Sequence, residues 1–258
     1  MSNYPSVCIC NTKQSGVDDS QVQAITEAVA KQVVNDFGPA WDTYASLYFC
    51  PATETPPAAM WNLMILDNSD QAGALGYHDL TPAGLPLGKV FAQTDAQYGE
   101  HLSVTVSHEL LEMLGDPFIN LSAQADDGKF YAFENCDAVE SDSLGYEIDN
   151  ILVSDFVLKP WFGHGEGKVD FRGHISSPFQ IAQGGYISIF DPGNGQGWTQ
   201  VQAREVSNLK DLTDALFNRS HKADLAAKYA HAVPRVGSRR ERRFRGSSNW
   251  LRSTYDQA

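Results

Sequence analysis

The spacing of apolar residues at the start of the chain predicts a strand followed by a helix. The strand is expected at residues 5–11. A helix over residues 20–36 is expected next, because apolar side chains recur there at helical spacing, at Val22, Ile25, Val29 and Val33. Gly38 and Pro39 are expected to end this helix.

Shorter apolar runs predict further strands before a second helix. These runs lie at residues 45–49, 61–67, 74–78 and 89–93, and the last two flank a stretch rich in proline and glycine. The second helix is expected from about Tyr98 to Leu114, with apolar residues on two stripes that bury most of its sides. Gly115 and Pro117 are expected to end it.

The second half of the chain predicts more strands. Residues 129–140 alternate as in a strand and are unusually acidic, which would place Glu134 and Glu140 on one face. A strand pair at 148–158, a strand at 184–190 and a helix at about 208–230 follow. The expected fold class is therefore α/β (α+β), with a mixed sheet, the second helix and a C-terminal helix in one domain over residues 1–234.

Composition places the chain among globular proteins. Its 258 residues are 42% hydrophobic, enough for a full core. No stretch approaches the roughly 20 apolar residues that span a bilayer, and the first residues lack the features of a signal peptide. The four cysteines predict reduced core thiols in place of disulfides, with a metal site at Cys8 and Cys10 as the alternative.

Charge is distributed unevenly. Residues 235–258 hold seven arginines against Glu241 and Asp256, a net charge of +5. The whole chain has a net charge of −13, so the remaining residues carry −18. We expect an extended basic arm that is either a solvated tail or a contact with an acidic protein partner. The acidic body argues against nucleic acid as the partner.

The residues with the clearest chemistry lie in the second helix, at His108-Glu109-x-x-Glu112. Positions i and i+4 share one helix face, so His108 and Glu112 are expected to bind one divalent metal while Glu109 acts as general base. A carboxylate in place of the usual second histidine keeps zinc as the first candidate and makes manganese or calcium more plausible than at a two-histidine site. The alternative is a structural network of buried polar groups.

A third metal ligand has to come from outside the helix. Glu134 in the acidic segment is the first choice, and Asp116, Asp137 and Glu140 are held in reserve. His78 is a candidate for a group that either supports a metal ligand or faces the substrate.

Residues 107–117, 133–140 and 153–162 resemble HExxE zincin-like proteins that are often encoded by tailed bacteriophages. The resemblance covers much of residues 60–200 and implies a zincin-like fold and a place in the virion or the host cytoplasm. The chain departs from the HExxHxxGxxH class, because Phe118 occupies the third ligand position and no methionine follows Met113.

Three readings of function follow. The first is a metallopeptidase-type enzyme acting on a peptide or peptidoglycan. The second is a virion structural or attachment protein without turnover, anchored to neighbouring subunits by residues 235–258. The third is a calcium-stabilised binding module using four carboxylates, Asp137, Glu140, Asp142 and Asp149.

Overall fold

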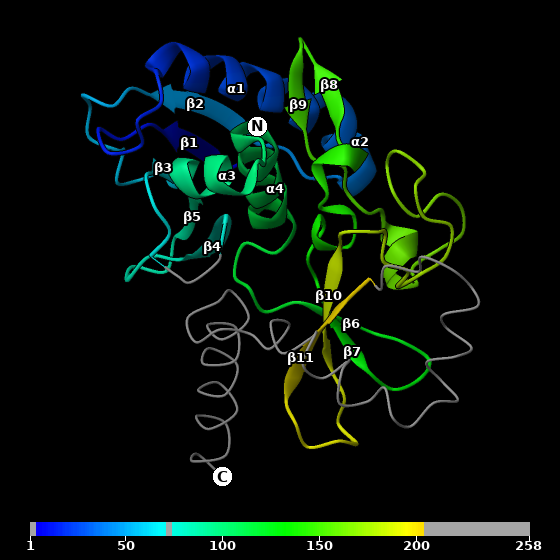
Figure 1. Cartoon of the computed structure of the whole chain (residues 1–258). Helices are drawn as coiled ribbons and strands as arrows, with labels where there is room; N and C mark the ends of the chain where they lie inside the picture. The colour runs from blue at the N-terminus through cyan, green and yellow to red at the C-terminus, as the bar shows by residue number, and fades with distance from the viewer. Residues whose placement is uncertain (1–3, 71–73, 204–258) are drawn as a thin grey trace.

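The computed structural model describes residues 4–70 and 74–203, which form two main sheets on either side of a central helix (Figure 1). The helix expected at 208–230 and the basic arm at 235–258 lie outside the described residues. Within the described part of the chain, the helices are too short or too polar to cross a membrane.

The larger sheet is mixed and has five strands in the order β2-β1-β3-β5-β4. The strands are β1 (Ser6–Cys10), β2 (Ser46–Cys50), β3 (Trp61–Leu66), β4 (Gly76–Leu80) and β5 (Pro86–Phe91). β2 and β4 are the two edge strands, and β4 runs antiparallel to β5, whereas the other neighbours are parallel. All five strands were predicted, although β4 and β5 extend further into the segment rich in proline and glycine.

The first helix continues beyond its expected end. α1 (Asp19–Gln32) runs into a π-helical turn at Val33–Phe37 and then into α2 (Gly38–Trp41). The prediction that Gly38 and Pro39 end the helix is wrong, because Pro39 occupies the first turn of α2, where its missing N–H costs no hydrogen bond.

The second helix begins later than expected, and a short helix that was not predicted comes before it. α3 (Ala92–Tyr98) ends at Gly99, whose φ of 77° is left-handed, and α4 (Leu102–Gly115) begins after it. The expected start at Tyr98 is therefore wrong, because the left-handed glycine turns the chain. The predicted end at Gly115 is confirmed.

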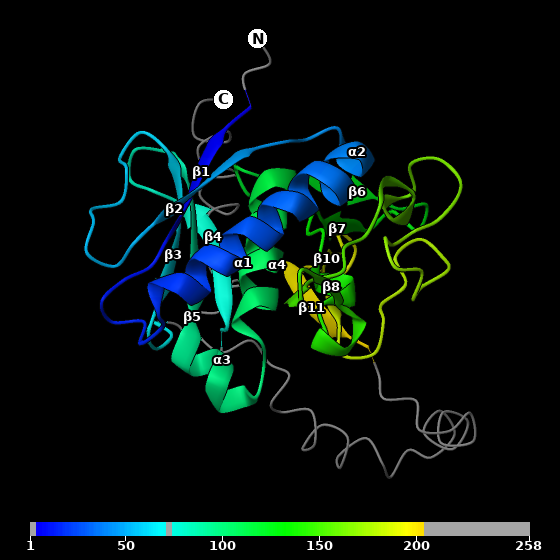
Figure 2. The ribbon, with the colours of Figure 1, turned by 90° about the horizontal axis from the view of Figure 1, so that it is seen from above.

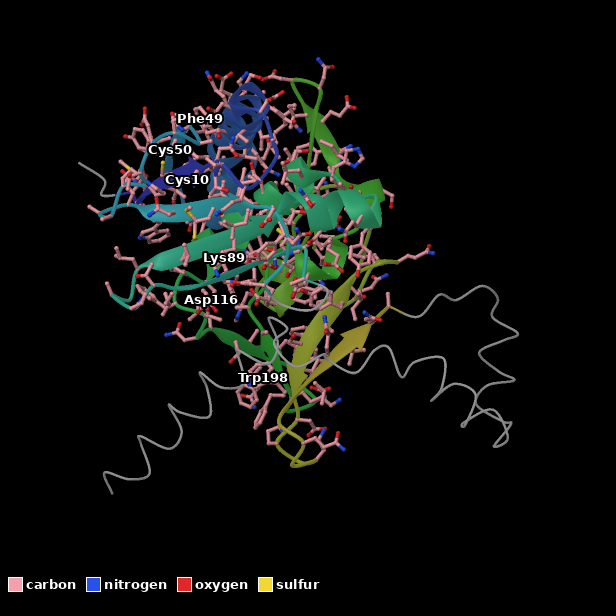
Figure 3. The ribbon with its side chains drawn as sticks, turned by 60° about the vertical axis from the view of Figure 1, so that its left-hand side comes forward. Cys10, Phe49, Cys50, Lys89, Asp116 and Trp198 are labelled. Carbon is pink, nitrogen blue, oxygen red and sulfur yellow. The ribbon has the colours of Figure 1, made fainter. Side chains whose placement is uncertain are left out.

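Strand alternation divides the larger sheet into two faces. Val7 and Ile9 belong to the main core, which also includes buried residues of α1 and α4, and Figure 2 shows these two helices lying alongside each other. Cys8 and Cys10 point to the opposite face, where they pack with Cys50 (Figure 3). All four cysteines are free and buried, as expected for core thiols. The thiols of Cys8, Cys10 and Cys50 lie within 4.8 Å of one another, so the alternative of a metal site stays a prediction.

The second sheet is antiparallel and has the order β11-β10-β7-β6. Its strands are β6 (Ser122–Gln124), β7 (Phe130–Ala132), β10 (Tyr186–Phe190) and β11 (Trp198–Gln202). A separate hairpin consists of β8 (Tyr146–Ile148) and β9 (Ile151–Val153), where a strand pair was expected somewhat later in the chain. The described residues also include three short 3-10 turns, at Asp137–Val139, Asp142–Leu144 and Lys159–Phe162.

The predicted acidic strand at 129–140 is wrong beyond Ala132. Residues 134–139 are all buried, so their side chains do not alternate between a core face and a solvent face. The segment leaves the sheet after β7 and ends in the 3-10 turn at Asp137–Val139. Glu134 and Glu140 therefore do not share the face of a strand.

A pair of buried carboxyl groups fixes the segment after β9. Asp155 Oδ1 accepts hydrogen bonds from the backbone N–H groups of Phe156 and Arg172, at 2.8 and 3.1 Å. Asp170 Oδ2 accepts one from Gly173 at 2.7 Å. The pKa of Asp155 is raised to about 8. Burial is the largest cause, and the hydrogen bond with the neighbouring Asp170 carboxyl also contributes. Asp155 is therefore protonated in the folded protein at neutral pH.

This raised pKa predicts a loss of stability as pH increases. Unfolded Asp155 releases its proton near pH 3.8, whereas the folded group keeps it to about pH 8. Unfolding therefore releases a proton between these values, and the free energy of unfolding falls as pH rises through this window, by at most about 1.4 kcal/mol per pH unit. Asp155→Asn should flatten this slope in urea denaturation between pH 5 and pH 8. Asp149→Asn, at an exposed ion pair with Lys31, serves as control and should keep the slope.

Candidate metal centre

α4 brings the two helix residues of the motif together as the sequence predicts. His108 Nε2 lies 3.2 Å from Glu112 Oε1, and both side chains are buried. The spacing of four residues accounts for this pairing, because residues i and i+4 are neighbours on a helix surface. The pair lies on a helix in which all residues from Val104 to Leu114 are buried.

The end of α4 positions the segment that completes the site. A Cβ atom at Gly115 would lie 2.1 Å from Asn135 Nδ2, so only glycine permits this close approach. Asn135 Nδ2 donates a hydrogen bond to Leu111 O at 3.4 Å, and Cys136 N donates one to Glu112 Oε1 at 3.4 Å. Residues 134–137 are thereby held against the last turns of the helix.

This contact brings a second carboxylate to the motif histidine. Asp137 Oδ1 lies 3.3 Å from His108 Nε2, and one donor atom each of His108, Glu112 and Asp137 lies within 4.8 Å of the others. One imidazole and two carboxylates form a donor set that suits a divalent metal such as zinc. The residues therefore fit the ion that the motif predicts, with Asp137, a reserve candidate in the sequence, beside His108.

Glu134, the first choice for the third ligand, lies in a neighbouring group. Its Oε2 is 3.2 Å from His78 Nε2, which is also 3.8 Å from Glu112 Oε2. His78, Glu112 and Glu134 have one donor atom each within 4.8 Å of the others. The structure thus brings Glu134 to Glu112 through His78 of β4, which the sequence indicated as a group that either supports a metal ligand or faces the substrate.

The other candidate carboxylates have different surroundings. Asp116 is fully buried, and its two oxygens accept backbone N–H groups of Asn120 and Leu121 at 3.1 and 2.9 Å. Figure 3 shows Asp116 between the two sheets. Of the four carboxylates proposed for calcium, three line one cavity, Asp137, Glu140 and Asp142, whereas Asp149 does not line it and pairs with Lys31.

Glu109, the predicted general base, is fully buried beside β4. A Cβ atom at Gly76 would lie 2.8 Å from Glu109 Oε1 and 2.9 Å from the methyl group of Thr105. The absence of a side chain at Gly76 therefore makes room for the Glu109 carboxylate. Gly76 and Thr105 both contribute to the wall of a cavity above the helix.

This cavity has a volume of about 420 Å³ and separates the two main sheets. One wall comes from β4 and the segment before it, the floor comes from α4, and the opposite wall comes from β10 and β11. Its lining includes His78, His108, Glu134 and Asp137 of the two groups, together with three further carboxyl groups, Glu100, Glu140 and Asp142. Both groups of candidate ligands therefore open into one space large enough for part of a substrate.

Two further side chains that line the cavity, Glu140 and Tyr186, have raised pKa values and hold their protons more strongly than usual. Burial raises the pKa of Glu140 to about 8, and repulsion from Asp137 contributes to the shift. Burial also raises the pKa of Tyr186 well above its usual range, again with contributions from Asp137 and Glu140. The phenol of Tyr186 therefore stays protonated and remains a hydrogen-bond donor at the cavity wall.

Sequence analysis did not single out Tyr186. The strand that carries it was predicted, but its approach to Asp137 depends on how the second sheet packs against α4.

Comparison of the chain with protein-family models, with curated proteins and with solved structures gives no match.

Proposed function

We propose that this protein is a metal-dependent hydrolase of peptide bonds with a zincin-like domain, acting on a protein or on the peptide of peptidoglycan. The observation that carries the proposal is the buried group of His108, Glu112 and Asp137, of which His108 and Asp137 line a cavity. Zinc is the first candidate for the metal, with manganese and calcium as alternatives.

The arrangement of the larger sheet supports the zincin-like assignment. A zincin-like domain was expected to combine a mixed sheet with a helix that carries the metal-binding motif. Here α4 packs against β4 and β5 at one edge of a mixed sheet, and Glu109 of the motif lies next to the edge strand β4.

A divalent ion bound by His108, Glu112 and Asp137 would lower the pKa of a bound water molecule and polarise a substrate carbonyl. Glu109 follows His108 directly on the helix, and in this mechanism its carboxylate accepts the proton of the attacking water. Glu109 then returns the proton to the leaving amine. The low dielectric around this fully buried carboxylate strengthens its interaction with a nearby positive charge.

The walls of the cavity provide the remaining functions. β4 is an edge strand of its sheet, and Gly76 and His78 on this strand line the cavity. An extended peptide can add to such a strand through backbone hydrogen bonds, which favours a peptide as the substrate. In this mechanism the protonated phenol of Tyr186, on the opposite wall of the cavity, donates a hydrogen bond to the substrate oxygen on which negative charge develops.

The proposal is tested by measuring metal content and hydrolysis in the same preparation. Purified full-length protein should contain divalent metal by elemental analysis, and it should cleave unstructured protein or peptidoglycan peptides. A chelator should remove both the metal and the activity, and added zinc should restore them. Protein that contains no divalent metal and binds none on titration would contradict the proposal.

A further inference from the structure

The carboxylate of Glu112 contacts two different histidines. Its Oε1 atom lies 3.2 Å from His108 Nε2, and its Oε2 atom lies 3.8 Å from His78 Nε2. The two histidines come from separate elements, α4 and the edge strand β4. Glu112 is fully buried between them.

Each histidine also has a carboxylate of its own. Asp137 Oδ1 lies 3.3 Å from His108 Nε2, and Glu134 Oε2 lies 3.2 Å from His78 Nε2. The result is two groups of the same composition, each with one imidazole, one terminal carboxylate and one share of Glu112. A carboxylate that faces two nitrogen-and-oxygen donor sets in this way is suited to bridge two metal ions, which in hydrolases lie about 3.5–4 Å apart.

The charge of the buried groups favours two ions over one. Glu112, Glu134 and Asp137 carry three negative charges when ionised, and at least nine-tenths of each residue is buried. Three carboxylates this close together can attract more than one divalent cation, since a single ion neutralises only two of their charges and the attraction strengthens in a buried site.

We propose that the cavity floor binds two divalent cations bridged by Glu112, one with His108 and Asp137 and the other with His78 and Glu134. This inference rests on the proposed function, because it adds a second ion to the site of the first. It assigns His78 as a metal ligand, which the HExxE motif does not include. Both ions adjoin the cavity of about 420 Å³, since His78, His108, Glu134 and Asp137 all line it.

The alternative is a single ion at His108, with the pair of His78 and Glu134 acting only to orient Glu112. A histidine that hydrogen-bonds to a carboxylate commonly supports a metal ligand in this way. The two arrangements differ in the number of ions bound. Only the arrangement with two bridged ions allows magnetic coupling between the ions.

The test uses Mn²⁺ and the full-length protein, stripped of metal by a chelator. Mn²⁺ suits carboxylate and imidazole ligands, and the three buried thiols of Cys8, Cys10 and Cys50 prefer softer metals. Wild-type protein should bind two equivalents of Mn²⁺ and give the electron paramagnetic resonance spectrum of an exchange-coupled pair. His78→Ala should bind one equivalent and give an uncoupled spectrum.

Two further variants keep the result interpretable. His78→Gln retains a polar side chain and should behave as His78→Ala does, which covers the case in which alanine disturbs the fold. His101→Ala changes an exposed histidine at the start of α4 and should retain the coupled pair. One uncoupled equivalent in the wild type would overturn the second ion and leave the proposed function standing. Absence of both Mn²⁺ and Zn²⁺ binding would overturn both, and two equivalents without coupling would overturn the bridge.

Discussion

Replacing His108 with alanine is expected to weaken binding of the ion held by His108, Glu112 and Asp137 by at least about 100-fold. The loss exceeds the roughly 10- to 100-fold effect of removing a group that only supports a ligand, because His108 supplies the nitrogen donor itself. Its Nε2 atom lies 3.2 Å from Glu112 Oε1 and 3.3 Å from Asp137 Oδ1, so its removal leaves two buried carboxylates without the imidazole.

The affinity is measured by competition with a chromophoric chelator, and circular dichroism establishes that the variant is folded. His101→Ala is the matched control, because His101 is a histidine at the start of the same helix but its side chain is 63% exposed and pairs with Asp142. Unchanged affinity in His108→Ala would exclude this group as the metal site. Equal losses in both variants would point to a general effect on the helix.

The sequence predicts the parts of this site that depend on local spacing. His108 and Glu112 are four residues apart on α4, and helical periodicity alone places them on one face. The end of α4 at Gly115 is equally local, because a glycine followed closely by a proline ends a helix. The strands of the larger sheet were predicted for the same reason, since each is a short apolar run between turn residues.

The remaining ligands depend on contacts between distant segments. Residues 129–140 alternate in sequence, but the close approach of Asn135 to Gly115 removes the segment from the sheet and buries Asp137 beside His108. No local pattern reports this approach. His78 reaches Glu112 because β4, at the edge of the sheet, packs against α4. This packing follows from the order of the strands and not from the residues around His78.

Replacing Glu109 with glutamine is expected to reduce hydrolysis by about 100- to 10,000-fold, the usual contribution of a general base. Metal content should remain that of the wild type, because the ligands His108, Glu112 and Asp137 are unchanged. The amide has nearly the same shape as the carboxylate, so it fits the space beside Gly76, where a Cβ atom would lie 2.8 Å from Glu109 Oε1. The measurement is kcat/KM on a peptide substrate together with elemental analysis of the same sample.

Glu100→Gln is the matched control, since it makes the same substitution in a glutamate that lines the cavity without belonging to either group of candidate ligands, and it should retain most of the activity. Gly76→Ala provides an independent test of position, because the added methyl group displaces the Glu109 carboxylate and should lower kcat while the metal stays bound. Wild-type activity in Glu109→Gln would show that another group takes the proton. Metal-loaded wild type that cleaves neither protein nor peptidoglycan peptides would instead favour a virion protein that keeps the metal for stability, since the base would then have no reaction to serve.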